Sequence, residues 1–433
     1  MGDWAGLIGI VALLALLAGG VRIGVALALV GMVGLSVLIS PEAAVIKSAL
    51  IAFDLASRYE LGVLPLFLLM AHLCFAAGAS RDFFEAASKW LGHRPGGLAL
   101  ASIGACGGFG AISGSSLATV ATVGLVALPE MRRRGYSPAL ATGVIAAGGS
   151  IGSLVPPSAA LIVFGILAEQ SIGRLFTAAI VPAVTQGLFY VAVVLVLCLI
   201  RPGLAPPVPR VAWSERWAAL ARLWDLGLLI FLVVGGIAFG WFAPTEAASV
   251  GCVGAALLSA RRGKLTAGAV GGAVRETLKT TGMIYLVVIG AIIFSTFIAA
   301  AGVAGQAASL VAGLRTSPTI VIVVMVLIIL GLGMFLDGLA LMTLVTPIFL
   351  PIVQSLGLSP IWFGVLLVRA MEIGFVHPPV GMNIYIIHGL APDIPLMTIF
   401  KGIVPFLLAD ALHLAFLIGF PIATLMLPGL LRA

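Results

Sequence analysis

Long apolar runs separated by short polar loops make up most of the chain, and the second half repeats the plan of the first. About 20 apolar residues are enough for a helix to cross the hydrocarbon core of a bilayer. The pattern therefore predicts an all-α, multi-pass membrane protein. The runs are residues 6–19, 23–39, 61–78 and 175–200 in the first half, and 223–242, 245–260, 283–301 and 394–426 in the second. Mixed stretches at 41–60, 81–94 and 266–280 predict amphipathic surface helices.

Four other apolar stretches contain breaks that a plain spanning helix would not carry. Residues 96–130 are interrupted by the Gly/Ser cluster at 113–116, and residues 319–351 by GLGMFLDG at 331–338. Each reads as a re-entrant helical hairpin. Residues 136–168 and 360–389 each contain a Pro-Pro pair, which removes backbone donors and forces the preceding residue out of the helical region. Each of these reads as a discontinuous helix, tolerated at membrane depth only where it is shielded by protein or lines a cavity.

The two halves align without a gap at an offset of 222 residues. The matches are mostly Gly, Pro and Ser at loop positions: Pro129/Pro351, Gly135/Gly357, Ser137/Ser359, Pro138/Pro360, Gly152/Gly374 and the pairs 156–157/378–379. We predict a first repeat over 1–200, a cytoplasmic linker with an interfacial helix over 201–222, and a second repeat over 223–433.

The loops between hairpin and broken helix differ in charge. MRRRGYSP at 131–138 carries three arginines, whereas the equivalent VQSLGLSP at 353–360 carries none. Under the positive-inside rule the two loops face opposite sides of the membrane. The repeats are therefore predicted to be inverted, with the amino terminus outside.

Composition narrows the function classes. The chain is 61% hydrophobic and only 9% charged, and its net charge of +7 comes mainly from basic residues in short loops. Membrane topology explains this charge, so we expect no nucleic-acid partner. The four cysteines lie in apolar segments without metal or redox spacing, and no Walker motif is present. No nucleophile, base and orienting group recur at usable spacing, so we expect no enzyme.

Inverted repeats with paired hairpins and broken helices are typical of secondary transporters that bind substrate near the bilayer midplane. The pattern alone also fits a stand-alone secondary carrier, an ion antiporter or, less well, a channel. Neighbouring genes for a periplasmic binding protein and a small four-span protein would favour a multi-component transporter.

Several motifs resemble one family over essentially the whole chain. SGSSLATVATVG, PEMRRRGYSP, GGSIGSLVPPS, FLDGLALMTLVTPIFLPI and PPVGMN are similar to the large membrane subunit of TRAP (tripartite ATP-independent periplasmic) transporters. The resemblance implies an elevator-type importer that moves a transport domain against a fixed scaffold. It places the protein in a bacterial inner membrane, so the outer amino terminus would lie in the periplasm. It also implies Na⁺ symport of small organic acid anions, delivered by a periplasmic substrate-binding protein, and a small four-helix membrane subunit. Because the repeats fill this chain, we expect that subunit to be a separate polypeptide.

The resemblance further implies two sodium sites. Unwound backbone exposes carbonyl oxygens, and hydroxyls supply further ligands that suit Na⁺. The family's first site corresponds to Gly110, Ser113, Gly152, Val155 and Pro157. The second corresponds to Gly333, Gly374, His377 and Val380. His377 departs from the family's usual Thr, which removes a hydroxyl ligand or adds sensitivity to protons.

Polar residues near the breaks are the candidates for the substrate cavity, because ionisable groups at membrane depth usually face a cavity or a partner. They are Ser115, Ser116, Asp337, Arg369 and Asn383. Arg369 has two interpretations: it binds a substrate carboxylate, or it forms an internal ion pair with Glu372, one helical turn away. The remaining histidines, His413 among them, show no ligand spacing and receive no role.

Overall fold

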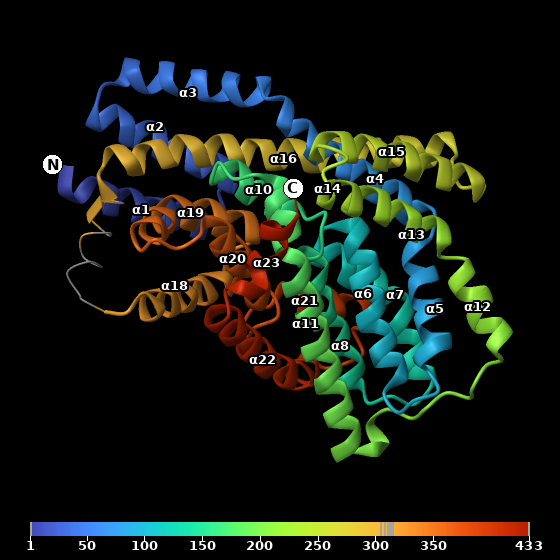
Figure 1. The fold of residues 1–433 in the computed structure, drawn as a ribbon. Coiled ribbons are helices and arrows are strands. Elements are labelled where there is room, and N and C mark those ends of the chain that lie inside the picture. Colours follow the sequence, from blue (N-terminus) through green and yellow to red (C-terminus); the bar gives the residue numbers. More distant parts are fainter. Residues whose placement is uncertain (1, 304, 307–308, 310–315, 432–433) are drawn as a thin grey trace.

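The computed structural model describes residues 2–303, 305–306, 309 and 316–431, and every regular element within them is a helix (Figure 1). The first half holds α1 (Gly2–Ala18), α2 (Ile23–Leu38), α3 (Pro41–Ser57), η1 (Tyr59–Gly62), α4 (Val63–Ala76), α5 (Ala79–Leu91), α6 (Gly97–Ser113), α7 (Ser116–Arg133), α8 (Pro138–Gly149), α9 (Ile151–Leu154), α10 (Ala159–Leu167) and α11 (Ile172–Ile200). The connecting segment holds η2 (Pro202–Leu204) and α12 (Trp213–Ala221).

The second half of the chain follows from Trp224 on. It holds α13 (Trp224–Ile230), the π-helical turn η3 (Phe231–Gly235), α14 (Gly236–Ala238), α15 (Pro244–Arg261), α16 (Ala267–Ala300), α18 (Pro318–Gly333), α19 (Gly338–Ser355), α20 (Pro360–Gly374), α21 (Met382–Leu390), α22 (Leu396–Gly419) and α23 (Ile422–Leu430). Five helices in the described residues are long and apolar enough to cross a membrane, or seven if each of two bent pairs is one span. The all-helical membrane fold predicted from the hydrophobic pattern is confirmed.

The predicted breaks fall where the Gly, Ser and Pro residues indicated. The first hairpin turns at residues 114–115, between α6 and α7, and the second at 334–337, between α18 and α19. The α8–α9 segment and α10 meet at an angle of 44° across the first Pro-Pro pair. The second Pro-Pro pair lies between α20 and α21. Each apolar stretch is therefore divided into two helices by residues that cannot continue one.

Helix bounds in the two halves follow the offset of 222 residues. α7 spans 116–133 and α19 spans 338–355, while α8 and α20 begin at Pro138 and Pro360. The glycines that follow α7 and α19, Gly135 and Gly357, have φ angles of 76° and 71°. Left-handed backbone of this kind favours glycine at a helix end. The opposite orientation of the two halves, and the repeat boundaries, stay predictions.

One sequence-based division into elements is wrong. Residues 266–280 and 283–301 were expected to form a surface helix followed by a span, but they form the single 34-residue helix α16. No Pro interrupts this stretch, and Thr266 caps its start by accepting a hydrogen bond from the Ala269 N–H. The last apolar run, 394–426, divides after Gly419 into α22 and α23, where Pro421 precedes the second helix.

α16 runs across the upper part of the molecule in Figure 1, and the two hairpins lie below it. It packs along α2 and also contacts α3, α4 and α19. Gly31 of α2 permits a close approach, since a Cβ there would lie 2.8 Å from the Phe294 backbone nitrogen of α16. Small residues at such crossings let helices pack backbone against backbone in a membrane.

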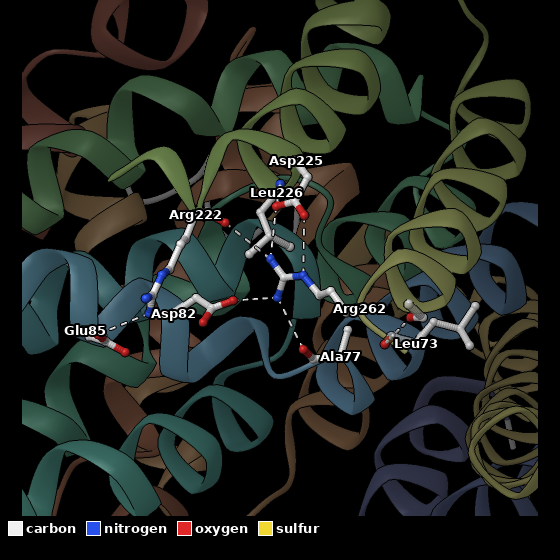
Figure 2. Close-up of polar contacts among 9 residues, drawn as sticks. Leu73, Ala77, Asp82, Glu85, Arg222, Asp225, Leu226 and Arg262 are labelled. Carbon is white, nitrogen blue, oxygen red and sulfur yellow. Dashed lines mark hydrogen bonds and ion pairs between the residues drawn. The ribbon is translucent and has the colours of Figure 1, made fainter. Parts of the chain in front are cut away.

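A polar cluster around Arg262 joins four segments at the end of α15 (Figure 2). The guanidinium donates to the Asp82 carboxylate of α5 at 2.5 Å, to the Asp225 carboxylate of α13 at 3.0 Å, and to the Ala77 carbonyl after α4 at 3.2 Å. Burial raises the pKa of Asp82, and the Arg262 charge opposes this shift. One arginine therefore connects the C-terminal end of α15 with α4, α5 and α13.

The arginine triplet after α7 makes surface ion pairs. Arg132 donates to Asp393 at 2.5 Å, and Arg133 and Arg134 both contact Glu130. The hydrogen bond from Arg132 lowers the pKa of Asp393. These contacts lie on exposed side chains, which agrees with the interpretation of the triplet as a loop signal and not a binding patch.

Candidate transport site

The tip of the first hairpin is a compact set of hydroxyl groups. Ser113 ends α6, Gly114 turns the chain with a φ of 58°, and Ser115 caps α7. The Ser113 Oγ lies 2.9 Å from the Thr119 Oγ1, and that hydroxyl donates to the Ser115 carbonyl at 2.7 Å. Buried hydroxyls and carbonyls therefore face one another at the turn.

This tip lies directly against the break between α9 and α10. A Cβ on Gly110 would lie 2.6 Å from the Cα of Gly152, so the two backbones touch. The Ala159 N–H donates to the Gly114 carbonyl at 3.3 Å in the same region. We call this contact between hairpin tip and broken helix the first crossing. Val155 follows α9 in an extended conformation, with ψ of 126°. A side chain at Gly114 would also collide with the Pro157 carbonyl.

The structure therefore gathers the five residues of the predicted first sodium site around one crossing. The glycine contact leaves no room for side chains, which lets backbone oxygens approach the tip. Carbonyl and hydroxyl oxygens of this kind suit a hard cation. These features fit Na⁺.

The second crossing has the same plan. A Cβ on Gly374, at the end of α20, would lie 2.6 Å from the backbone carbonyl carbon of Gly333, at the end of α18. The His377 N–H donates to the Gly374 carbonyl at 3.3 Å, and its Nδ1 lies 2.6 Å from the Pro378 carbonyl oxygen. Val380 follows in the same unwound segment. The glycine pair and the unwound segment fit the predicted second sodium site, whereas the His377 ring interacts with its own loop.

Ser116 and Asn383 connect the two halves of the chain. The Asn383 Nδ2 donates to the Ser116 Oγ at 2.9 Å and to the Ala146 carbonyl at 3.2 Å. Asn383 is completely buried, and Ser116 is 2% exposed. Ser116 starts α7 of the first hairpin, while Asn383 lies in α21, just after the second break. The structure thus brings two predicted substrate residues from the two halves together.

Two other predicted substrate residues, Ser115 and Asp337, cap helices at the hairpin tips. Ser115 is half-buried and caps α7 by accepting from the Ala118 N–H at 3.4 Å. Asp337 is exposed and caps α19, accepting from the Leu339 and Ala340 N–H groups at 2.9 and 3.0 Å. Hydrogen bonds at a helix N-terminus stabilise a carboxylate there. Asp337 therefore has a structural role at the second tip.

Arg369 is fully buried and forms an ion pair with Asp410 of α22, which is also fully buried. The alternative pair with Glu372 is not formed. The helical spacing placed Glu372 within reach, but the guanidinium turns instead towards α22, where its Nε also donates to the His413 Nδ1 at 3.0 Å. His413, to which the sequence assigned no role, is therefore a partner of the buried arginine.

The Arg369–Asp410 pair continues into α11 and α8. The Tyr190 hydroxyl donates to the Asp410 carboxylate at 2.6 Å and lies 3.0 Å from the Ser150 Oγ. The Gln186 Nε2 donates to the Ser150 Oγ at 2.7 Å. This network joins the α8–α9 junction with α11, α20 and α22. Buried charges persist in an apolar setting only when they are paired and hydrogen-bonded in this way.

Sequence reasoning missed Thr119, Ser153, Tyr190 and Asp410. Ser153 accepts from the Ser116 N–H at 2.9 Å and so fixes the start of α7. A signal existed for Asp410, because an acidic residue inside a predicted span requires a partner. The identity of that partner, 41 positions away in the sequence, depends on how α20 and α22 pack.

Together the fold and the site define a multi-pass helical membrane protein whose polar centre is built from two hairpin tips and two broken helices. The chain matches the family model described as tripartite ATP-independent periplasmic transporter, DctM component, over residues 10–423. It therefore belongs to this family and is a large permease subunit of a TRAP transporter, not an enzyme.

Similar curated proteins agree. The chain is 34% identical to the C4-dicarboxylate TRAP transporter large permease protein DctM of Pseudomonas aeruginosa, covering 90% of this chain and 91% of that protein. It is 31% identical to the sialic acid TRAP transporter large permease protein SiaM of Vibrio cholerae, covering 86% and 87%. It is 30% identical to the ectoine TRAP transporter large permease protein TeaC of Halomonas elongata, covering 84% and 85%.

Two solved structures share the fold. The YdaH transporter of Alcanivorax borkumensis superposes with a TM-score of 0.63 at 15% identity, over 89% of each chain. MtrF of Neisseria gonorrhoeae superposes with a TM-score of 0.58 at 14% identity, over 88% of this chain and 84% of that one. At these identities the likeness describes the arrangement of helices.

Proposed function

We propose that this chain is the permease through which a secondary transporter imports small organic acid anions together with Na⁺. The observation that carries the proposal is the paired crossing, in which each hairpin tip meets a broken helix through a glycine contact. Gly110 meets Gly152, and Gly333 meets Gly374. Broken helices of this kind supply carbonyl oxygens for a cation and helix N-termini for an anion.

Two sodium sites are proposed at these crossings. The first lies at the α6–α7 tip, with the ligands Gly110, Ser113, Gly152, Val155 and Pro157. The second lies at the end of α20, with the ligands Gly333, Gly374, His377 and Val380. Because the His377 ring faces its own loop, backbone oxygens carry the second site.

The substrate is proposed to bind between the crossings, beside Ser115 and the Ser116–Asn383 contact. Those side chains offer hydroxyl and amide groups that can hydrogen-bond a carboxylate, and α7 begins at this point. A helix N-terminus favours an anion. The relatives named for C4-dicarboxylates and sialic acid support a carboxylate as the substrate class.

The assembly is proposed to contain two further proteins: a small four-helix membrane subunit and a periplasmic substrate-binding protein. The tripartite family to which the chain belongs supports both. We further propose an elevator mechanism, in which the hairpins and broken helices move together against a scaffold that contains α2 and α16.

Reconstituted uptake tests the proposal. The complex with both partners, in proteoliposomes, should accumulate a carboxylate from a panel only under an inward Na⁺ gradient. Uptake that follows a proton gradient and ignores Na⁺ would contradict sodium coupling. Equal uptake without the binding protein would favour a stand-alone carrier instead.

Topology needs a separate experiment. Single cysteines in R134C and L356C variants, placed in a background without the four native cysteines, should react with an impermeant thiol reagent from opposite sides of the membrane. Labelling of both from the same side would refute the inverted orientation of the repeats.

A further inference from the structure

A pocket of about 470 Å³ lies beside Arg262, where α15 ends and α13 begins. Three arginines and two aspartates line it: Arg222, Arg261 and Arg262, with Asp82 and Asp225. Figure 2 shows Arg262 between the two aspartates, with the Arg222 side chain turned towards Glu85. Neither the proposed sodium sites nor the proposed substrate site uses this pocket.

Arg262 is already paired. Its guanidinium contacts the Asp82 carboxylate at 2.5 Å and the Asp225 carboxylate at 3.0 Å, and none of the three side chains is more than 25% exposed. Two carboxylates share one guanidinium, so this group has one negative charge in excess. A further anion in the pocket therefore depends on the other two arginines.

Arg222 and Arg261 are available to a ligand. The Arg222 side chain is 67% exposed, and its ion pair with Glu85, at 3.6 Å, uses a carboxylate that also contacts Lys89 at 3.3 Å. Arg261 is exposed and forms no ion pair with any described residue; its guanidinium carbon lies 4.7 Å from the centroid of the Trp224 ring. Stacking on a ring leaves the N–H groups at the edge of a guanidinium free to donate.

These charges leave one positive charge without a partner. Lys89 balances Glu85, and the two exposed arginines carry two positive charges against the single excess charge of the Arg262 group. Guanidinium groups do not lose their proton in proteins, so a protonated carboxyl in the pocket would only enlarge this excess. The pocket therefore suits a ligand with one negative charge, and the fork of N–H groups fits the oxygens of a phosphate.

The helices α13 and α15 extend from the pocket side by side. At the pocket Asp225 of α13 meets Arg262. Farther along, a Cβ on Gly251 of α15 would lie 3.1 Å from the Val233 Cγ2, just beyond α13. The chain therefore leaves the pocket along α13 and returns to it along α15, so the two helices share one surface.

Exposed apolar side chains follow this surface away from the pocket. Leu257 and Val253 precede Arg261 by four and eight residues on α15, and Leu228 follows Trp224 by four residues on α13. Residues four apart lie on the same face of a helix. The charged pocket therefore lies at one end of two apolar rows, which is the arrangement of charge and hydrocarbon in a phospholipid.

We propose that this pocket binds the phosphate of one anionic phospholipid, held by Arg222 and Arg261, while the acyl chains lie along the apolar rows of α13 and α15. A phosphatidylglycerol headgroup carries the single negative charge that the pocket requires, whereas a zwitterionic headgroup adds a cation beside the arginines. Residues 261–264 are predicted to be cytoplasmic, which places the lipid in the inner leaflet, where basic pockets between helices favour anionic headgroups. This inference goes beyond the proposed transport function.

Equilibrium binding of radiolabelled phosphatidylglycerol to the purified complex of this chain with its small subunit, in a neutral detergent, tests the site. The wild type should bind one such lipid per chain in a saturable manner. R222Q and R261Q should each weaken this binding about fivefold, since each removes one positive charge beside the phosphate. The double variant should weaken it about 25-fold.

Lys401 provides the matched control. It is an exposed lysine of α22, outside the pocket, and K401Q also removes one positive charge. K401Q should keep the lipid affinity within about twofold of the wild type. Thermal unfolding of R222Q and R261Q without lipid should match the wild type, because exposed ion pairs contribute little to stability.

Two further ligands identify what the pocket recognises. Phosphatidylcholine should bind about fivefold more weakly, because its cationic group offsets about one arginine. Glycerol phosphate, which has the phosphate and no acyl chains, should not displace the lipid. Equal affinity for phosphatidylcholine would overturn the preference for an anionic lipid, and displacement by glycerol phosphate would show a site for soluble phosphate compounds instead.

The remaining outcomes also decide the proposal. Wild-type affinity in the double variant, or an equal loss in K401Q, would overturn the assignment of Arg222 and Arg261 as phosphate ligands. A complex that binds no phosphatidylglycerol, and whose small subunit dissociates in the double variant, would show that this subunit covers α13 and α15. None of these measurements involves Na⁺, so a failure of sodium coupling would leave the lipid site intact.

Discussion

Replacing Gly374 with alanine should weaken sodium binding by displacing the second hairpin. The added Cβ would lie 2.6 Å from the backbone carbonyl carbon of Gly333 and 2.8 Å from its Cα. Ordinary contact begins at 3.4 Å, so α18 and α20 must separate by about 0.8 Å. The colliding atoms belong to the backbone, so no rotamer change relieves them.

Overpacking of this kind costs about 1–3 kcal/mol. If the cost falls on the ion-bound arrangement, Na⁺ affinity decreases by about tenfold for each 1.4 kcal/mol. The assay is the Na⁺ concentration for half-maximal uptake, together with thermal unfolding of the purified protein with and without Na⁺. Half-maximal uptake by G374A should therefore require about 5- to 150-fold more Na⁺, and Na⁺ should raise the unfolding temperature of this variant less than that of the wild type.

Gly331 is the matched control. It lies in α18 two residues before Gly333, and a Cβ there would meet nothing within 4 Å. G331A should therefore behave as wild type. Wild-type sodium dependence in a folded G374A variant would refute the claim that the glycine contact determines the second site.

Three further predictions concern polar contacts. Asp410→Asn removes the carboxylate that the buried guanidinium contacts and should lower stability by about 3–5 kcal/mol, measured by thermal unfolding; an unchanged transition would contradict the pairing. Arg262→Ala should lower the free energy of unfolding by about 1–3 kcal/mol, because the Asp82 and Asp225 carboxylates lose their partner. Lys264→Ala, at an exposed position, should leave thermal unfolding unchanged, and equal effects of the two variants would contradict a stabilising role of the Arg262 cluster. Ser116→Ala and Asn383→Ala should show a coupling of about 0.5–3 kcal/mol in a double-mutant cycle of stability, and strict additivity would rule out their direct contact.

The sequence predicted the broken elements well because their causes are local. A glycine with a φ of 58° at Gly114 and two Pro-Pro pairs interrupt helices whatever surrounds them. Likewise, the pairs that touch at the crossings, Gly110 with Gly152 and Gly333 with Gly374, lie on positions selected from the motifs. The structure adds the contact distances between these glycines, whereas the sequence already indicated the glycines themselves.

The partners of buried charges could not be predicted in the same way. Arg369 and Glu372 lie one helical turn apart, which made a local ion pair plausible. The packing of α20 on α22 instead places the Arg369 guanidinium against the Asp410 carboxylate. The continuity of α16 was missed for a related reason. The mixed polar and apolar residues at 266–280 suggested a separate surface helix, whereas one helix can continue past the edge of the hydrocarbon core.

The length of α16 has a mechanical consequence. At 34 residues it is about 51 Å long, against a hydrocarbon core of about 30 Å. Its apolar C-terminal half packs on α2, and its charged N-terminal half continues the same axis without a joint. If the membrane-embedded part of α16 tilts, its exposed N-terminal end therefore moves with it. A partner that held that end would restrict the angle at which the whole helix crosses the bilayer.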